Sequence, residues 1–236
     1  DCRSVVASIF VNPTQFGPNE DFGSYPRNME RDLQMLQAEG VDLVFAPTVE
    51  EMYPKGFSTY VNVEQITDVL EGGRRPGHFR GVATIVTKLF TIVRPDKSYF
   101  GQKDGQQVAV IKRMTADLVL GTEIVVVPTV READGLAMSS RNVYLTPAER
   151  AAAPVLYRAL CRAREMHMAG ERSAATLRQE VTRMIGSEPL GKLDYISVAD
   201  AATLQELETV DKPAMISLAV RFGRARLIDN IMVGES

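Results

Sequence analysis

Several features that would indicate other classes of protein are scarce in this sequence. Its two cysteines, Cys2 and Cys161, are too few for a disulfide framework, and with only two histidines in the chain they argue against a zinc site. No apolar run reaches about 18 residues, so no membrane-spanning helix is expected, and the first residues do not resemble a signal peptide. The net charge of −3 offers no electrostatic footprint for nucleic acid or an acidic membrane.

What remains is the composition of an ordinary globular enzyme. Of the 236 residues, 45% are hydrophobic and 24% are charged, and a chain of this length can bury a sizeable core. The sequence has no internal repeat and no low-complexity segment. We therefore expect a cytoplasmic protein of two modest domains, without a metal site of its own.

Strands and helices alternate through the first half of the chain. The apolar run at 5–11 is typical of a strand buried in a parallel sheet. Further elements are expected as helices at 28–38, 81–93 and 104–120 and as strands at 43–46, 96–100 and 123–127. This alternation predicts an α/β fold with a doubly wound parallel sheet over residues 1–129.

The pattern changes after Pro128. Two helices are predicted at 147–168 and 174–185, followed by β-rich runs near 195–198, 215–220 and 225–229. The last two runs flank residues 221–224, a candidate hairpin turn. We therefore predict that residues 130–236 form a second, smaller α+β domain.

A first cluster of polar residues follows the strand at 96–100. The strand ends at Gly101, and Lys103 and Asp104 open the next helix. Backbone N–H groups at a helix N-terminus and a nearby ammonium suit a phosphate, while a carboxylate suits ribose hydroxyls or a helix cap. Gln107 lies one turn later on the same side. Taken alone, this junction fits a capped helix with a solvated lysine equally well.

Two further clusters point to anionic or polar ligands. Ser139, Ser140 and Arg141 combine two hydroxyls with a guanidinium that matches phosphate geometry, although alone they fit a helix-entry loop better. Asn12 and Gln15 place two amides after the strand at 5–11, at the edge where open α/β sheets bind ligands. Alternatively, Asn12 and Gln15 are only surface polar residues of a turn that contains Pro13 and Gly17.

The segment at 73–81 contains three arginines and His78 among glycines and a proline. Such a segment is either an anion-binding loop or a mobile turn. We favour a loop near the ligand pocket and assign no catalytic role to His78.

These clusters occur in the order found in one family of enzymes, whose motifs match residues 8–17, 75–79, 99–104 and 139–142. The chain resembles the pantothenate synthetases, which belong to the nucleotidylyltransferase superfamily, and the similarity runs from residue 5 to residue 231. The resemblance implies a Rossmann-like nucleotide-binding domain and a homodimer. It also implies ATP-dependent condensation of pantoate with β-alanine through a pantoyl adenylate, releasing AMP and pyrophosphate, with Mg²⁺ on the ATP and no tightly bound organic cofactor.

The resemblance also assigns residues to the reaction. It implies an ATP site lined by Gly101, Gln102, Lys103, Asp104, Val130, Met138, Ser139, Ser140 and Arg141. Adenylyl transfer needs cations and donors that neutralise charge on the phosphates, and the candidates for this task are Lys103, Ser139, Ser140 and Arg141. Asn12, Gln15 and Gln107 are expected to bind pantoate, and Gln15 also β-alanine.

The sequence departs from the family in two places. The family begins with a strand and a His-x-Gly-His loop that contacts the ATP phosphates, and this sequence contains no such motif; Gln102 also replaces a usual glutamate. Because Asp1 and Cys2 run almost directly into a core strand, we expect an N-terminal domain that lacks its first strand. The alternative hypotheses are another nucleotidylyltransferase, against which the neutral Gln15 and Gln107 count, and a non-catalytic nucleotide-binding module.

Overall fold

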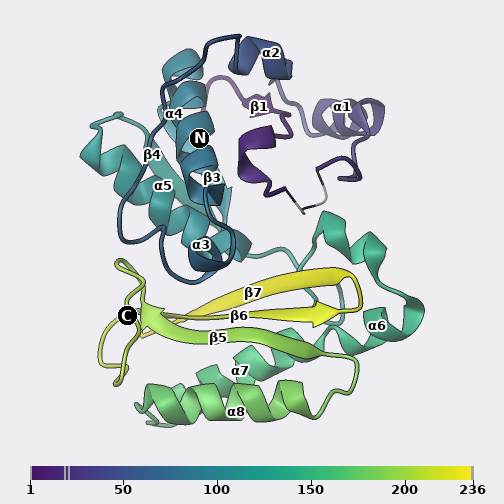
Figure 1. Ribbon diagram of the computed structural model, residues 1–236, viewed down its shortest axis with the longest axis vertical. Coiled ribbons are helices and arrows are strands. Elements are labelled where there is room, and N and C mark those ends of the chain that lie inside the picture. Colours follow the sequence, from purple (N-terminus) through teal and green to yellow (C-terminus); the bar gives the residue numbers. More distant parts are fainter. Residues whose placement is uncertain (1, 19, 21, 235–236) are drawn as a thin grey trace.

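The structure is a computed structural model that describes residues 2–18, 20 and 22–234. Figure 1 shows two stacked regions: parallel strands with flanking helices in one, and a three-stranded antiparallel sheet backed by helices in the other. This arrangement confirms the predicted fold class, an α/β unit with parallel strands followed by a smaller α+β unit. None of the helices in the described ranges is long and apolar enough to cross a membrane.

The parallel strands form two pairs. One pair is β1 (Val6–Ser8) with β2 (Leu43–Phe45), and the other is β3 (Lys97–Gly101) with β4 (Glu123–Val127). The sequence predicts a single sheet, but among the described residues no ladder joins the two pairs. They are held together through a shared core, because apolar side chains from both pairs pack against buried residues of the intervening helices.

Those helices are η1 (Pro13–Gln15), α1 (Met29–Ala38), α2 (Val49–Met52), α3 (Glu71–Arg74), α4 (His78–Val93), η2 (Gln102–Asp104) and α5 (Gly105–Asp117). Helix α4 begins three residues earlier than predicted, because Gly77 takes a left-handed conformation (φ 83°) and allows a sharp entry. It lies against η1 at Gly81, where an added Cβ would be 2.4 Å from the carbonyl oxygen of Thr14. Only glycine permits this approach, which brings the segment carrying Gln15 beside α4.

The second region contains η3 (Ser140–Tyr144), α6 (Pro147–Ala152), α7 (Val155–Met168) and α8 (Ala174–Gly186). The sequence predicts one helix over 147–168, and the structure breaks it in two at Pro154. Proline has no N–H for the helical ladder and its ring clashes with the preceding turn, so α7 starts afresh after it.

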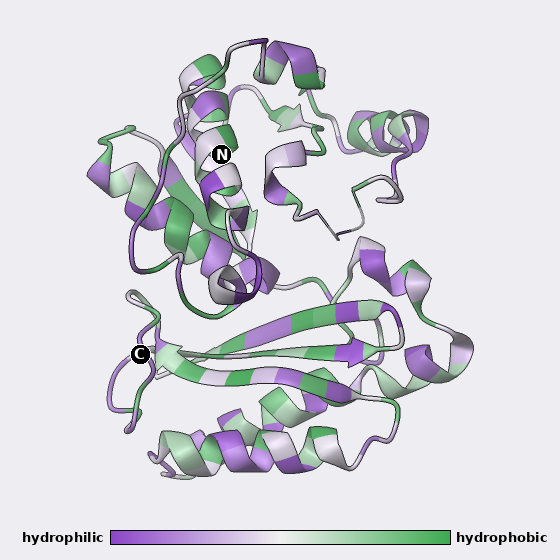
Figure 2. Ribbon diagram, in the orientation of Figure 1, coloured by the Kyte–Doolittle hydropathy of each residue, from purple (hydrophilic) through white to green (hydrophobic). Residues whose placement is uncertain are grey.

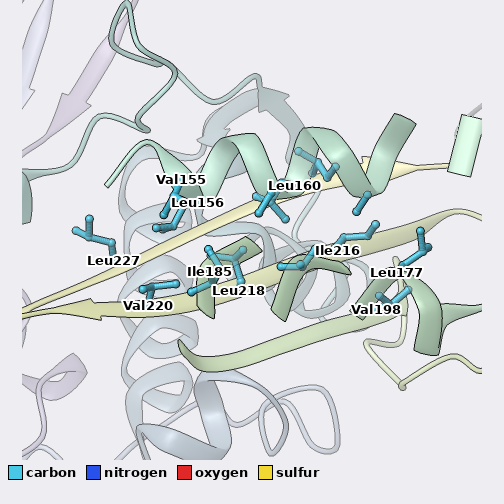
Figure 3. Close-up of a cluster of buried hydrophobic side chains, with 14 of the residues drawn as sticks. Val155, Leu156, Leu160, Leu177, Ile185, Val198, Ile216, Leu218, Val220 and Leu227 are labelled. Atoms are coloured by element: carbon cyan, nitrogen blue, oxygen red, sulfur yellow. The ribbon is translucent and has the colours of Figure 1, made fainter. Parts of the chain in front are cut away.

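The antiparallel sheet has the order β5 (Lys192–Asp200), β6 (Ala214–Phe222), β7 (Ala225–Val233). Gly223 and Arg224 connect β6 to β7, which confirms the predicted hairpin. Side chains of β6 alternate between two cores: Ile216 and Leu218 pack against α7 and α8, as Figure 3 shows, while Met215 packs into the core of the first region. The sheet is therefore buried on both faces, and α8 turns its polar residues outward (Figure 2).

We propose that the domain boundary lies at residue 129. Most of the first core comes from residues before this point and most of the second from residues after it. Leu204 and Met215 cross the boundary to join the first core. The two units therefore share apolar contacts as well as the polar contacts described below.

Candidate active site

A cavity of about 770 Å³ lies between the two regions, bordered by η1, α3 and η2 of the first region and by η3 and the β6–β7 hairpin of the second. It brings together five residues that the sequence singles out, namely Gln15, Lys103, Asp104, Ser139 and Arg141. Among the described residues, seven basic side chains and four carboxylates line it. This balance of charge suits an anionic ligand.

Lys103 and Asp104 enter the cavity from η2, the tight turn that joins β3 to α5. The ammonium of Lys103 lies 3.2 Å from a carboxylate oxygen of Asp104, and neither side chain is buried. Asp104 occupies the N-cap position of α5 but makes no side-chain capping bond. Its carboxylate therefore faces the cavity and contacts Lys103 instead of capping the helix.

Gly101 and Gln102 belong to the same turn but do not line the cavity. The side-chain amide of Gln102 instead donates a hydrogen bond of 2.8 Å to Oδ1 of Asn230 in β7. The first cluster is thus divided between residues that face the cavity and residues that fix the turn.

The Ser139–Arg141 cluster forms the entry to η3. Oγ of Ser139 accepts a hydrogen bond of 3.2 Å from the backbone N–H of Arg141, which leaves the Ser139 proton available to a ligand. The hydroxyl of Ser140 does not reach the cavity and donates to the hydroxyl of Tyr25 at 3.1 Å. The Arg141 guanidinium lies 5.9 Å from the centre of the Tyr25 ring. Tyr25 therefore packs against this cluster.

Val130 and Met138 are joined through their backbones, since the N–H of Met138 donates to the carbonyl of Val130 at 3.0 Å. Their side chains are exposed and do not line the main cavity. The loop between them is held by Arg131, whose guanidinium makes a two-pronged ion pair of 2.6 and 2.9 Å with the buried Asp229.

The three amides that are expected to bind pantoate have different surroundings. Gln15 lines the main cavity, and Gln107 lines a smaller adjoining one of about 50 Å³. Asn12 lines neither and is only 2% exposed. Its Nδ2 donates to the carbonyl of Gly81 at 3.1 Å, and its Oδ1 accepts from the hydroxyl of Tyr53 at 2.8 Å. The amide of Asn12 is thus occupied in holding η1 against α4.

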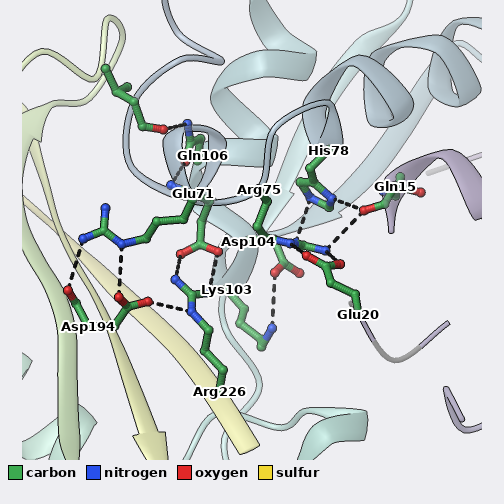
Figure 4. A network of polar contacts seen from close by, with 12 residues as sticks. Gln15, Glu20, Glu71, Arg75, His78, Lys103, Asp104, Gln106, Asp194 and Arg226 are labelled. Carbon is green, nitrogen blue, oxygen red and sulfur yellow. Dashed lines mark hydrogen bonds and ion pairs between the residues drawn. The ribbon is translucent and has the colours of Figure 1, made fainter. Parts of the chain in front are cut away.

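Arg75 and His78 form a network of polar contacts (Figure 4). The sequence indicates an arginine-rich segment here but not its partners. Arg75 holds the carboxylate of Glu20 through two bonds of 2.7 Å and points Nη1 at Nε2 of His78, 3.1 Å away. Nδ1 of His78 lies 2.8 Å from the carbonyl oxygen of Gln15. Burial, and then the charge of Arg75, lower the pKa of His78 to about 4, so the ring is neutral near pH 7.

A second network joins the two regions along the wall of the cavity. Arg226 of β7 makes a two-pronged ion pair with Glu71 of α3, at 2.7 and 2.9 Å, and bonds Asp194 of β5 at 2.8 Å. Arg74 also bonds Asp194, at 3.2 Å. Burial opposes ionisation of Asp194, but these two guanidiniums hold its pKa below the usual range. Apart from Arg74, no local signal in the sequence marks these residues.

No group of three or more histidine, cysteine, aspartate and glutamate side chains within the described ranges is arranged to hold a metal ion. The residues that line the cavity offer recognition by cations, hydroxyls and amides. A polyanion beside Lys103 and Arg141 and a small polar ligand beside Gln15 and Gln107 fit this distribution.

Comparison with known proteins places this geometry in context. A family model described as pantoate-beta-alanine ligase matches residues 1–232. The pantothenate synthetase of Herpetosiphon aurantiacus is 60% identical over 97% of this chain and 83% of its own length, and that of Chloroflexus aurantiacus is 61% identical over 100% and 84%.

Two solved structures are also similar. The crystal structure of pantothenate synthetase from Thermus thermophilus has a TM-score of 0.94 and 52% identity, over 97% of this chain and 83% of that one. The pantoate-beta-alanine ligase of Francisella tularensis, solved with beta-gamma ATP and β-alanine, has a TM-score of 0.76 and 36% identity, over 97% and 79%.

Proposed function

The chain belongs to the pantoate–β-alanine ligase family, and on that basis we propose which of its residues carry each part of the reaction. The enzyme joins pantoate to β-alanine at the expense of ATP. The observation that carries this conclusion is the family match over residues 1–232, together with relatives of about 60% identity over nearly the whole chain.

The order of the chemistry follows from the reactivity of a carboxylate. An amine cannot convert a carboxylate to an amide directly, because oxide would have to leave the acyl carbon. Attack of the pantoate carboxylate on the α-phosphorus of ATP forms a pantoyl adenylate and expels pyrophosphate. The amine of β-alanine then attacks the acyl carbon, and AMP leaves. Neither step requires a covalent bond to the protein, so positioning and charge stabilisation must supply the catalysis.

Lys103 and Arg141 are the cations of the proposed adenylyl-transfer site. Both side chains enter the same cavity, from η2 and η3 respectively. They would neutralise charge on the α-phosphate and the departing pyrophosphate, and the free proton of Ser139 would add a neutral donor. Ser140 belongs to this set only if its hydroxyl turns from Tyr25 to a phosphate oxygen.

The remaining ATP contacts divide between two segments. Asp104, which makes no capping bond, suits the ribose hydroxyls. Val130 and Met138 offer apolar surface from the loop that follows β4, and Gly101 and Gln102 form the backbone of the Lys103 turn. We propose that ATP enters as its Mg²⁺ complex, because the phosphates supply most of the oxygen ligands that this ion needs.

Gln15 and Gln107 are the proposed pantoate ligands, with Gln15 also near β-alanine. An amide offers both a donor and an acceptor, and pantoate carries hydroxyls together with a carboxylate. For Asn12 we propose an indirect part in pantoate binding. Its amide is buried and occupied by Gly81 and Tyr53, so it would shape the pocket by holding η1 in place.

We also propose that the enzyme is a homodimer and works in the cytoplasm, as the family resemblance and the composition suggest. Light scattering would test the first point. A mass equal to one chain at micromolar concentration contradicts it.

The residue assignment is tested by separating the two half-reactions. Lys103→Ala should lower the rate of pyrophosphate release from ATP and pantoate by on the order of 10²-fold, as for other preorganised electrostatic donors. Addition of pantoyl adenylate and β-alanine should restore AMP release, because the second step does not use the triphosphate. Lys112→Ala, an exposed lysine on the same helix as Gln107, is the control and should leave both rates unchanged. Normal pyrophosphate release by Lys103→Ala contradicts the assignment.

A further inference from the structure

Asn230 of β7 is buried against the turn that carries Lys103. Its side chain is 4% exposed, and its Nδ2 donates hydrogen bonds of 2.9 Å to the backbone carbonyls of both Gln102 and Lys103. Its Oδ1 accepts from the side-chain amide of Gln102 at 2.8 Å. One asparagine therefore uses both amide protons and its oxygen on a single turn of three residues.

This contact crosses from one region of the molecule to the other. The turn belongs to the first region, whereas β7 is a strand of the antiparallel sheet. The close approach needs glycine at 105, because an added Cβ there would lie 3.1 Å from both amide atoms of Asn230 and 2.5 Å from Sδ of Met215. Gly105, the first residue of α5, therefore lies directly against strands β6 and β7.

Asp229, the residue before Asn230, anchors the loop that leads to Ser139. Asp229 binds Arg131 at 2.6 and 2.9 Å, and Arg131 follows Val130 in the loop that leads to Ser139. Oδ1 of Asp229 also accepts from the backbone N–H of Asn230 at 2.8 Å. Two consecutive residues of β7 therefore fix the turn of Lys103 and the loop before Ser139 relative to one another.

We propose that Asn230 is a positioning residue for adenylyl transfer, which sets the place of the Lys103 ammonium relative to Ser139 and Arg141. The inference rests on the proposed role of Lys103. A flexible lysine is effective only where its backbone is fixed, and a displacement of about 1 Å at a reacting centre can cost on the order of 10²-fold in rate. Asn230 itself touches no reacting atom.

Two substitutions test the hydrogen bonds separately from the packing. Asn230→Ala removes all three bonds. Asn230→Asp keeps the shape and the acceptor but sets a carboxylate oxygen against two carbonyl oxygens. Both variants should lower kcat for pyrophosphate release by about ten- to a hundredfold, with a much smaller change in the KM for pantoate. Ile231→Val, a mild change in the next buried residue of β7, is the control for loss of packing and should keep kcat.

A double-mutant comparison identifies the residue through which Asn230 acts. In the Lys103→Ala background, Asn230→Ala should cause little further loss of kcat, because the group that it positions is gone. An undiminished further loss in that background overturns the inference, and so does a normal kcat in folded Asn230→Asp. If Lys103→Ala alone has normal activity, the role of Lys103 fails instead, which distinguishes the two outcomes.

Discussion

Nε2 of His78 accepts a hydrogen bond from Nη1 of Arg75, 3.1 Å away. A guanidinium can only donate, so Nε2 must be unprotonated and the single ring proton must sit on Nδ1, where it is donated to the carbonyl of Gln15. Arg75 and Gln15 thereby fix the tautomer of a neutral histidine. The pairing accounts for a histidine beside the cavity without a proton-transfer role.

This neutral histidine predicts a pH dependence of stability. The pKa of His78 is about 4 in the folded protein and about 6.5 in the unfolded chain. Between these values only the unfolded chain binds the proton, so the free energy of unfolding should fall as the pH is lowered from 6.5 to 4, by up to roughly 1.4 kcal/mol per pH unit from this group. Urea unfolding at several pH values measures this change in the free energy of unfolding.

The control for that experiment is His78→Gln, which keeps an acceptor for Arg75 but cannot titrate. Its free energy of unfolding should vary less between pH 6.5 and 4.5 than that of the parent protein. Equal slopes for the two proteins would mean that His78 is not the group responsible.

A second prediction separates the amides from the cations. Gln15→Ala and Gln107→Ala should weaken pantoate binding and leave ATP binding nearly intact, and Arg141→Ala should do the reverse. Each lost hydrogen bond to a charged ligand group is worth roughly 1.5–3 kcal/mol, or about ten- to a hundredfold in affinity. Titration calorimetry with each ligand measures both, with the exposed Gln37→Ala as the control. Equal effects on both ligands would contradict the division.

A third prediction concerns the ion pair between Glu71 and Arg226. Arg226→Ala leaves the carboxylate of Glu71, whose side chain is 8% exposed, buried without its counter-charge. The expected loss of unfolding free energy is about 3 kcal/mol. Glu71→Ala should cost less, because Arg226 keeps Asp194 as a partner.

Arg183→Ala is the matched control for the third prediction, since that arginine pairs with Glu180 on an exposed face of α8. Its unfolding midpoint in urea should equal that of the parent protein. The interpretation is wrong if Arg226→Ala and Arg183→Ala unfold at the same urea concentration.

A fourth prediction tests the approach of α4 to η1. Gly81→Ala places a methyl group 2.4 Å from the carbonyl oxygen of Thr14, so η1 must shift. We expect a loss of about 1–3 kcal/mol in unfolding free energy and weaker pantoate binding, because Gln15 moves with η1. Gly186→Ala, at a helical position with nothing within 4 Å of the added Cβ, should be neutral or slightly stabilising. Unchanged pantoate affinity in Gly81→Ala would show that Gln15 does not depend on this contact.

Features that depend on neighbouring residues could be predicted from the sequence. The sequence predicts strand β4 at its observed bounds, and a turn that contains a glycine marks the β6–β7 hairpin. The junction after β3 was also visible, because a strand, a glycine and a helix follow one another directly. The sequence analysis predicts one helix over 147–168, whereas the structure has two, because the chain starts a new helix after Pro154.

Which side chains face the cavity, and what holds them, depends on the tertiary structure. Nothing local shows that the amide of Asn12 turns inward while that of Gln15 turns outward, because both suit a polar turn. Nor does any periodicity pair Glu71 with Arg226, or Lys103 with Asn230, across more than a hundred residues of chain. Periodicity indicates only whether a residue faces a core, whereas its hydrogen-bonding partners depend on how segments far apart in the sequence pack together.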